Sequence, residues 1–164
     1  REGMSALLVT HDRQEALGLA DRVAVLGAHP SGHGTTVVQM DTPAALYSAP
    51  ATREVALLTG PATFLEAEAW GAKASTVLGD VELSQAAHGS VTLVVRPNQL
   101  LATPDPAGLG RVIHCHFVGP AYRISAESPA GRVCIENVIE PLEPGTAIDI
   151  SLNRACAPLP SESL

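Results

Sequence analysis

The first sixty residues alternate short apolar runs with polar junctions, a pattern typical of alternating strands and helices. The unbroken apolar run at residues 5–10 predicts a strand buried on both faces. Asp12, with Glu15 three positions later, predicts the capped start of a helix. Later runs predict two more strands and two short helices: strands at residues 22–26 and 36–40, and helices at residues 44–48 and 52–58.

After residue 60 the pattern changes to short runs rich in Val, Ile, Leu and Thr, separated by Gly, Pro and Asp. Their spacing of about ten residues predicts a small β-barrel or sandwich. The sequence Ser-Pro-Ala-Gly-Arg at residues 128–132 predicts a hairpin turn, residues 102–110 a linking loop, and residues 155–164 a loose tail. The predicted strands are residues 64–69, 73–78, 90–96, 111–118, 122–127, 132–137 and 147–152.

Charge and composition narrow the classes of protein to consider. The chain carries 10 Lys and Arg against 17 Asp and Glu, a net charge of −7, and has no basic run, which argues against a nucleic-acid partner. No apolar stretch approaches the roughly 20 residues that cross a bilayer, so direct membrane insertion is not expected. Three widely spaced cysteines without a C-x-x-C pair indicate neither a disulfide framework nor a zinc cluster.

Residues 7–60 resemble the end of the nucleotide-binding domain of ABC importer ATPases. The resemblance rests on LLVTHDRQEAL, ADRVAVL, VVQMDTPAALYSAP and VALLTGPATFL, which occur in the order found in that family. It implies that His11 is the switch-loop histidine, which contacts the γ-phosphate of ATP. From the residues alone, the favoured interpretation of His11 is a polar residue at a strand-to-helix junction, and Asp12 is interpreted as a helix cap.

The motifs that hold the rest of the nucleotide do not occur in this sequence. It contains no G-x-x-x-x-G-K-[ST] phosphate loop, no LSGGQ-like signature and no apolar strand ending in Asp-Glu for Mg²⁺. We therefore expect a C-terminal fragment of a longer subunit that does not hydrolyse ATP alone. ATP and Mg²⁺ would serve the full-length parent, and no cofactor is expected in the fragment.

Residues 61–164 resemble the TOBE-type accessory domain that follows the ATPase domain, an oligonucleotide-binding-fold-like barrel. The matching stretches are LVVRPNQL and HFVGPAYRISAE. With LGDVEL they look most like the ferric-iron importer branch, with polyamine, sulfate and sugar importers as competitors. The fold expected is thus an α/β remnant, residues 1–60, followed by an all-β barrel, residues 61–164.

The resemblance implies a regulatory and dimer-contact fragment of an importer subunit that couples ATP hydrolysis to uptake of a solute, ferric iron in the first instance. Its expected partners are membrane-spanning permease subunits and a second copy of itself, at the cytoplasmic face of the cell membrane. Two alternatives stay open: a module that senses a small oxyanion or a metal, and a purely structural dimerisation domain.

Three further groups of residues are candidate sites. Arg96 follows an apolar strand, where it could bind an oxyanion or an acidic partner or form a structural salt bridge. His114 and His116 share one face of a predicted strand, so they form either a weak metal half-site or ordinary polar alternation. His29 and His33 lie in a Gly/Pro-rich loop, where a surface loop is favoured over a metal site.

Overall fold

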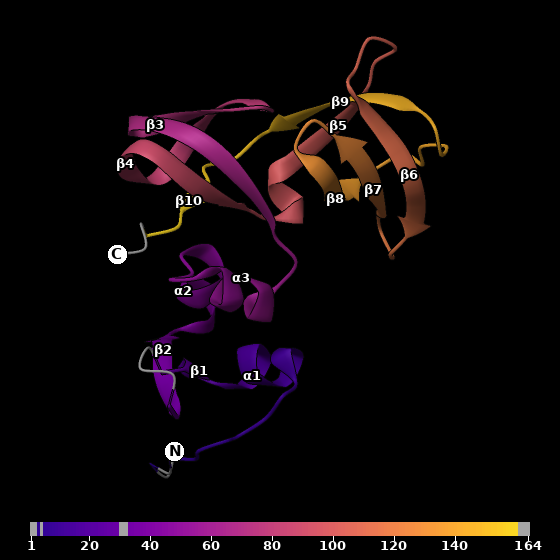
Figure 1. Cartoon of the computed structure of the whole chain (residues 1–164). Helices are drawn as coiled ribbons and strands as arrows, with labels where there is room; N and C mark the ends of the chain where they lie inside the picture. The colour runs from indigo at the N-terminus through magenta and orange to yellow at the C-terminus, as the bar shows by residue number, and fades with distance from the viewer. Residues whose placement is uncertain (1–2, 4, 30–32, 161–164) are drawn as a thin grey trace. The chain divides into compact units, whose positions relative to one another are not determined.

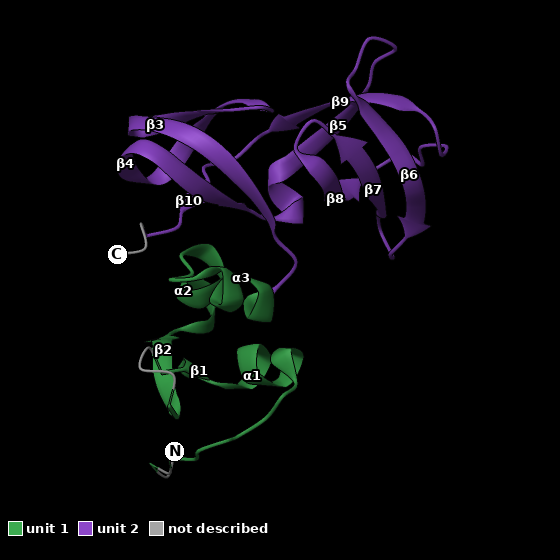
Figure 2. Cartoon of the chain, viewed as in Figure 1, with its two compact units in different colours: residues 1–59 green, residues 60–164 purple. Residues whose placement is uncertain are grey.

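A computed structural model describes residues 3, 5–29 and 33–160 of the chain (Figure 1). The chain divides into two compact units, Arg1–Thr59 and Gly60–Leu164 (Figure 2). The described residues are mostly β-strand with a few short helices. None of the described helices has both the length and the apolar character needed to cross a bilayer.

Unit 1 begins each of its first two helices with a side-chain cap, as the sequence predicts. Asp12 Oδ1 accepts hydrogen bonds from the backbone N–H groups of Gln14 (2.7 Å) and Glu15 (3.1 Å), and Thr42 Oγ1 accepts from that of Ala45 (3.3 Å). The elements of unit 1 are α1 (Arg13–Leu19), β1 (Val23–Ala28), β2 (Thr35–Asp41), α2 (Pro43–Ser48) and α3 (Arg53–Thr59).

The predicted buried strand at residues 5–10 is wrong. None of these residues is in a strand, and the side chains of Leu7 and Val9 are 93% and 85% exposed. An apolar run forms a buried strand only where neighbouring strands complete its hydrogen bonds. Within the described part of unit 1 the strands are β1 and β2, which pair antiparallel with each other.

Unit 2 contains two antiparallel sheets. One has the strand order β10-β4-β3 and the other the order β5-β9-β6-β7-β8. A 3₁₀-helix, η1 (Pro97–Gln99), connects β4 to β5. The strands are β3 (Thr63–Thr76), β4 (Gly79–Val95), β5 (Leu100–Pro104), β6 (Gly110–Phe117), β7 (Tyr122–Ser128), β8 (Gly131–Val138), β9 (Ala147–Leu152) and β10 (Ala157–Pro158).

The β7–β8 hairpin, in which Ser128 pairs with Gly131, confirms the predicted turn, whereas the first residues of the loop predicted at 102–110 belong to β5, which ends at Pro104. The two strands predicted at residues 64–69 and 73–78 form the single strand β3, whose register with β4 shifts between Gly71 and Lys73. Gly71 takes a φ of 70°, and from Gly71 to Lys73 the partner residue moves from Ala87 to Glu82, so the extra residues of this irregularity lie in β4.

Within the described residues 155–160, the tail predicted to be loose instead joins a sheet through β10, and the rest of that tail, residues 161–164, lies outside the described residues. Cys156 is fully buried, its carbonyl accepts a hydrogen bond from Ser84 N–H (2.9 Å), and Ala157 pairs with Val94. Pro158 cannot donate to a neighbouring strand, which suits it to the edge position that β10 occupies.

One apolar core joins the two sheets of unit 2. Along β3, inward-facing Leu65, Ala67 and Ala69 alternate with exposed residues, and Ile124 and Ile135 face the same core from β7 and β8. The five-stranded sheet is strongly curled, because its opposite edge strands, β5 and β8, approach within 8 Å between Cα atoms. This curl places the two free sheet edges opposite each other.

Candidate functional site

His11 lies where a strand-to-helix junction was predicted, but it follows an extended segment instead of a strand. Its side chain is exposed, and it directly precedes Asp12, the cap of α1. Asp12 therefore acts as a helix cap, while its own N–H donates to Thr10 Oγ1 (3.0 Å). Within this chain, His11 is the one residue that the family resemblance assigns to the nucleotide, and that role stays a prediction.

Arg96 lies inside unit 2, with only 4% of its surface exposed. Its Nη1 donates hydrogen bonds to the carbonyl oxygens of Gly60 (3.1 Å) and Pro61 (3.2 Å), the first residues of the unit. Its backbone N–H donates to Gln99 Oε1 (2.6 Å). These contacts give Arg96 a positioning role at the start of the unit, and a role toward a ligand or partner stays a prediction.

Gln99 extends this contact to the C-terminal side of unit 2. Its Nε2 donates to the carbonyl of Ala155 (2.6 Å), and its own carbonyl accepts from Asn153 N–H (3.0 Å). The first residues of the unit, the 3₁₀-helix and the segment before β10 are thereby linked through two adjacent polar side chains. Sequence reasoning identified Arg96 but not Gln99, because only the fold shows that residues 153–155 lie beside it.

His114 and His116 lie together on the exposed face of β6, with ring centres 5.9 Å apart. Across the sheet they are opposite Ser125 and Arg123 on β7. Arg123 is turned to β8, where its Nη2 lies 2.7 Å from Glu136 Oε1. Among the residues that the structure describes, no three or more potential metal ligands of the His, Cys, Asp or Glu type are grouped together.

Two cysteines of unit 2, Cys134 and Cys156, have the environments of inert thiols. Burial raises the pKa of Cys156 to about 11, and partial burial also raises the pKa of Cys134, with Arg123 opposing and Glu136 adding to that shift. A nucleophilic cysteine needs the opposite, a lowered pKa. The geometry therefore gives no support to thiol catalysis at these two positions.

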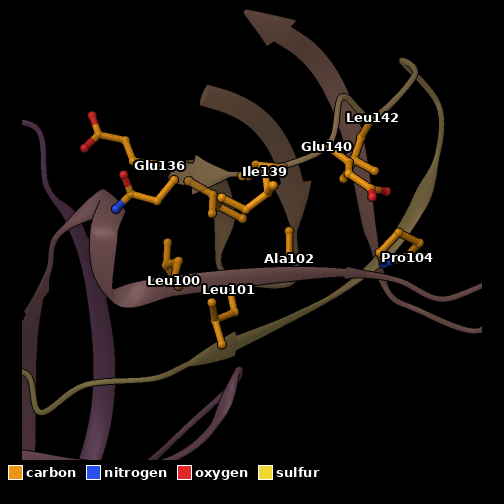
Figure 3. Close-up of a pocket in the computed structure, with 11 residues that line it drawn as sticks. Leu100, Leu101, Ala102, Pro104, Glu136, Ile139, Glu140 and Leu142 are labelled. Carbon is orange, nitrogen blue, oxygen red and sulfur yellow. The ribbon is translucent and has the colours of Figure 1, made fainter. Parts of the chain in front are cut away.

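A half-open hollow of about 240 Å³ lies in the seam between the free edges of β5 and β8 (Figure 3). We call it the seam hollow. No pattern in the sequence predicts this hollow, because it arises only when the sheet curls and brings its two edges together. Its lining residues are Leu100, Leu101, Ala102, Pro104, Ile135, Glu136, Asn137, Val138, Ile139, Glu140 and Leu142.

A distortion of β8 borders the seam hollow. Asn137 has a φ of 62°, and within the described part of the chain no other residue except glycine has a positive φ. Here two residues of β8, Glu136 and Asn137, lie opposite the single residue Arg123 of β7, which is a β-bulge. Such bulges change the direction of a strand, and here the change occurs where β8 meets the hollow.

No protein-family model matches the chain, but several curated proteins do. It is 38% identical over 121 residues to the Fe(3+) ions import ATP-binding protein FbpC 1 of Rhodococcus jostii, covering 73% of this chain and 33% of that protein. It is 34% identical over 172 aligned positions to the sulfate/thiosulfate import ATP-binding protein CysA 2 of Chromobacterium violaceum, covering 94% and 45%. It is 40% identical over 119 residues to the sn-glycerol-3-phosphate import ATP-binding protein UgpC of Ruegeria pomeroyi, covering 68% and 30%.

These relatives are much longer than the region they share with this chain. The chain spans 33%, 45% and 30% of their respective lengths. All three are import ATP-binding proteins, although the solutes in their names differ. The chain is therefore homologous to the C-terminal portion of the ATP-binding subunits of ABC importers.

Proposed function

We propose that this chain is the C-terminal regulatory and dimer-contact part of an ABC importer ATP-binding subunit, which couples ATP hydrolysis to solute uptake. The observation that carries the proposal is homology to several import ATP-binding proteins over 68–94% of the chain. The full subunit would act at the cytoplasmic face of the membrane with permease subunits and a second copy of itself. The nucleotide and Mg²⁺ would be held chiefly by residues outside this chain.

Within that subunit, His11 would contact the γ-phosphate, a role suited to an imidazole N–H that stabilises charge on the phosphoryl oxygens. Its exposed position before α1 supports the proposal. In the full-length subunit, H11A should lower ATP turnover by about a hundredfold while ATP binding persists. D12A should instead act mainly on stability by removing the helix cap. Unchanged turnover in H11A would remove this assignment.

We propose ferric iron as the solute, because three FbpC proteins of Rhodococcus jostii match at 38%, 37% and 36% identity. Matches to sulfate and glycerol-phosphate import proteins make those solutes the direct competitors. Uptake of labelled ferric iron, sulfate and sn-glycerol 3-phosphate should be compared in cells with and without the intact gene. Loss of sulfate or glycerol-phosphate uptake with normal iron uptake would replace the proposed solute.

We further propose that unit 2 is a TOBE-like barrel of the oligonucleotide-binding-fold type. Support comes from its five-stranded antiparallel sheet, whose edge strands curl toward each other. Light scattering of the full-length subunit at increasing concentration tests the dimer-contact role. A subunit lacking residues 60–164 should dimerise more weakly, and an unchanged dimer would assign the contact elsewhere.

Metal sensing is a second candidate function, favoured by the ring separation of His114 and His116. A zinc ion bound to an imidazole at about 2.0–2.1 Å lies about 3.2 Å from the ring centre, so tetrahedral binding by two rings places their centres about 5.2 Å apart. The observed 5.9 Å needs only a small side-chain adjustment. Oxyanion sensing has less support, because Arg96 is buried and the seam hollow is bordered by carboxylates.

Calorimetric titration of the chain with Zn²⁺ and Ni²⁺ tests this second candidate. Binding should weaken by about tenfold or more in H114A and in H116A, because each removes one of only two protein ligands. H88A, which removes an exposed histidine on β4, is the matched control. Equal binding by H114A and the native chain would eliminate the site.

A further inference from the structure

The seam hollow lies between the edges of β5 and β8 that face each other. Among the strands that the structure describes, β5 pairs only with β9 and β8 only with β7. A whole strand inserted between them would hold them about 9.5 Å apart, twice the usual spacing of 4.7–4.9 Å. Their Cα atoms already approach within 8 Å. An occupant therefore enters the hollow with side chains, while its backbone stays outside.

The volume of the hollow indicates what size of group fits. Its 240 Å³ equals about eight water molecules at 30 Å³ each. This lies below the range of about 300–1,000 Å³ typical of pockets for drug-sized ligands. The space instead suits one long side chain, and a partner that contributes one side chain must make its other contacts on the surrounding surface.

That surrounding surface is apolar and exposed. The floor is formed partly by the buried side chain of Leu100. Leu101 on β5 and Ile139 after β8 border the hollow and are 48% and 76% exposed. Figure 3 shows Ile139 on the same side of β5 as Leu100 and Ala102, whereas the side chain of Leu101 projects from the opposite side of that strand. A segment lying along the seam would cover the exposed side chain of Ile139.

The charge at the border favours a basic occupant. Glu136 and Glu140 both line the hollow, and Figure 3 shows them toward opposite ends. Glu136 is already bound to Arg123 at 2.7 Å. Glu140 is exposed and, within the described part of the chain, has no ion-pair partner. A lysine or arginine can lay its aliphatic stem on an apolar floor and place its charge beside this carboxylate.

From these observations we propose that the seam hollow is a docking groove for an extended segment of a partner protein, in which a lysine or arginine stands next to an apolar residue. The basic side chain enters the hollow and meets Glu140, and the apolar neighbour covers Ile139. The bulge at Asn137 changes the direction of β8 at its end, so that this end does not continue the regular strand pairing with β7 and the groove keeps its shape. This proposal does not depend on which solute the subunit imports.

Nuclear magnetic resonance titration of the ¹⁵N-labelled chain tests the groove with two defined peptides. One is acetyl-Gly-Arg-Leu-Lys-Val-Gly-amide, and the other has Glu in place of Arg and Lys. The basic peptide should shift the amide signals of residues 101, 102 and 137–140, and the shifts should weaken with added salt. The acidic peptide should leave these signals unchanged.

Variants decide whether Glu140 receives the basic side chain. E140K should weaken binding of the basic peptide by about tenfold or more, because it reverses the charge. E140Q should weaken binding by less, because it only removes the charge. E143K, on the same loop but outside the lining of the hollow, is the matched control and should change affinity by less than about twofold.

Three results would overturn the proposal. They are equal binding of the acidic peptide, shifts located away from the seam, and E140K binding as well as the native chain. Concentration-dependent shifts of residues 101 and 137–140 without peptide would also overturn it, because they would identify a second copy of this chain as the occupant. None of these outcomes bears on the transport function, which is tested through ATP turnover and solute uptake.

Discussion

At the scale of single residues, the polar interior of unit 2 depends on Arg96. Its guanidinium supplies donors to the carbonyl groups of Gly60 and Pro61, and its backbone N–H is held by Gln99. A buried carbonyl that loses its donor pays the full cost of desolvation, which is larger than the net gain from making the bond. Arg96 is therefore needed mainly because the buried carbonyl of Gly60 would otherwise be left without a donor.

We expect R96M to lower the free energy of unfolding of the chain by about 2–4 kcal/mol. The free energy of unfolding of R96K should lie between those of the native chain and R96M, because an ammonium group keeps the charge but does not reproduce the planar guanidinium. Urea denaturation followed by circular dichroism measures the difference. R111M, at an exposed position of β6, is the control and should change stability by less than about 0.5 kcal/mol. Equal effects of R96M and R111M would contradict the positioning role.

Because Cys156 is buried, we expect the chain to lose stability at alkaline pH. Burial raises its folded-state pKa to about 11 from an ordinary value of 9.0. The folded state holds the thiol proton of Cys156 more tightly than the unfolded state does. The stability that this thiol contributes is therefore fully present below pH 9 and is lost between pH 9 and pH 11. Over that interval the chain should lose about 2–3 kcal/mol from this group.

Urea titrations at pH 8, 9, 10 and 11 on the native chain and on C156A separate this effect from other groups that titrate in the same range. C156A should be less stable at pH 8, because it removes buried volume, but should depend less steeply on pH. Parallel pH profiles for the two proteins would show that Cys156 does not contribute.

At the scale of elements, the sequence predicted what is decided locally. The helix caps Asp12 and Thr42 were predicted because each bonds to N–H groups two or three residues away. The irregularity beside Gly71 was not predicted, because it depends on the partner strand. The pairing of Ala157 with Val94 was missed for the same reason. Residues 5–10 were wrongly predicted, since apolar character indicates burial only where a covering partner exists.

The candidate sites also differ in whether a local sequence pattern predicts them. The shared face of His114 and His116 follows from the period of a strand and was predictable. The seam hollow requires the curl of a whole sheet and the positive φ of Asn137, which no local pattern indicates. Two assignments stay predictions: that residues 1–60 are the end of a nucleotide-binding domain, and that residues 61–164 are a TOBE-like barrel.

The turn between β5 and β6 depends on a close backbone approach. A Cβ atom added at Gly108 would lie 2.3 Å from the carbonyl carbon and oxygen of Ile148 on β9. Because backbone atoms cannot move aside alone, G108A should displace the β5–β6 connection and destabilise unit 2 by about 2–4 kcal/mol. G18A in α1, where nothing lies within 4 Å of the added atom, is the matched control. It should be neutral or stabilising by up to about 1 kcal/mol. Thermal unfolding of both variants measures the contrast, and equal behaviour would contradict it.

At the scale of the whole molecule, the two units differ in how well their apolar residues are covered. Unit 2 has a continuous core, whereas unit 1 exposes the run at residues 7–9. A contiguous exposed apolar run is a site of association, and isolated exposed apolar side chains are ordinary. The exposure of this run therefore matters more for the behaviour of the chain in solution than that of single residues such as Leu109.

We expect the 164-residue chain to self-associate through residues 7–9. The variant L7S/V9S should reduce both the apparent mass in light scattering and the fluorescence of a bound apolar dye. L109S, which replaces a single 80%-exposed leucine in unit 2, should leave both signals nearly unchanged. If L7S/V9S and L109S gave the same result, association would have to involve another surface.

The position of β10 has a consequence for how the chain folds during its synthesis. Ala157 pairs with Val94, and the carbonyl of Cys156 is bound by Ser84, so the sheet begun by β3 and β4 is completed by residues made much later. Contacts between such distant segments form slowly, because a long loop must close first. Unit 2 therefore cannot reach its native state while residues 156–158 are still inside the ribosome. Until they emerge, the neighbouring edge of β4 lacks its partner strand, and this is the interval in which a chaperone would be most useful.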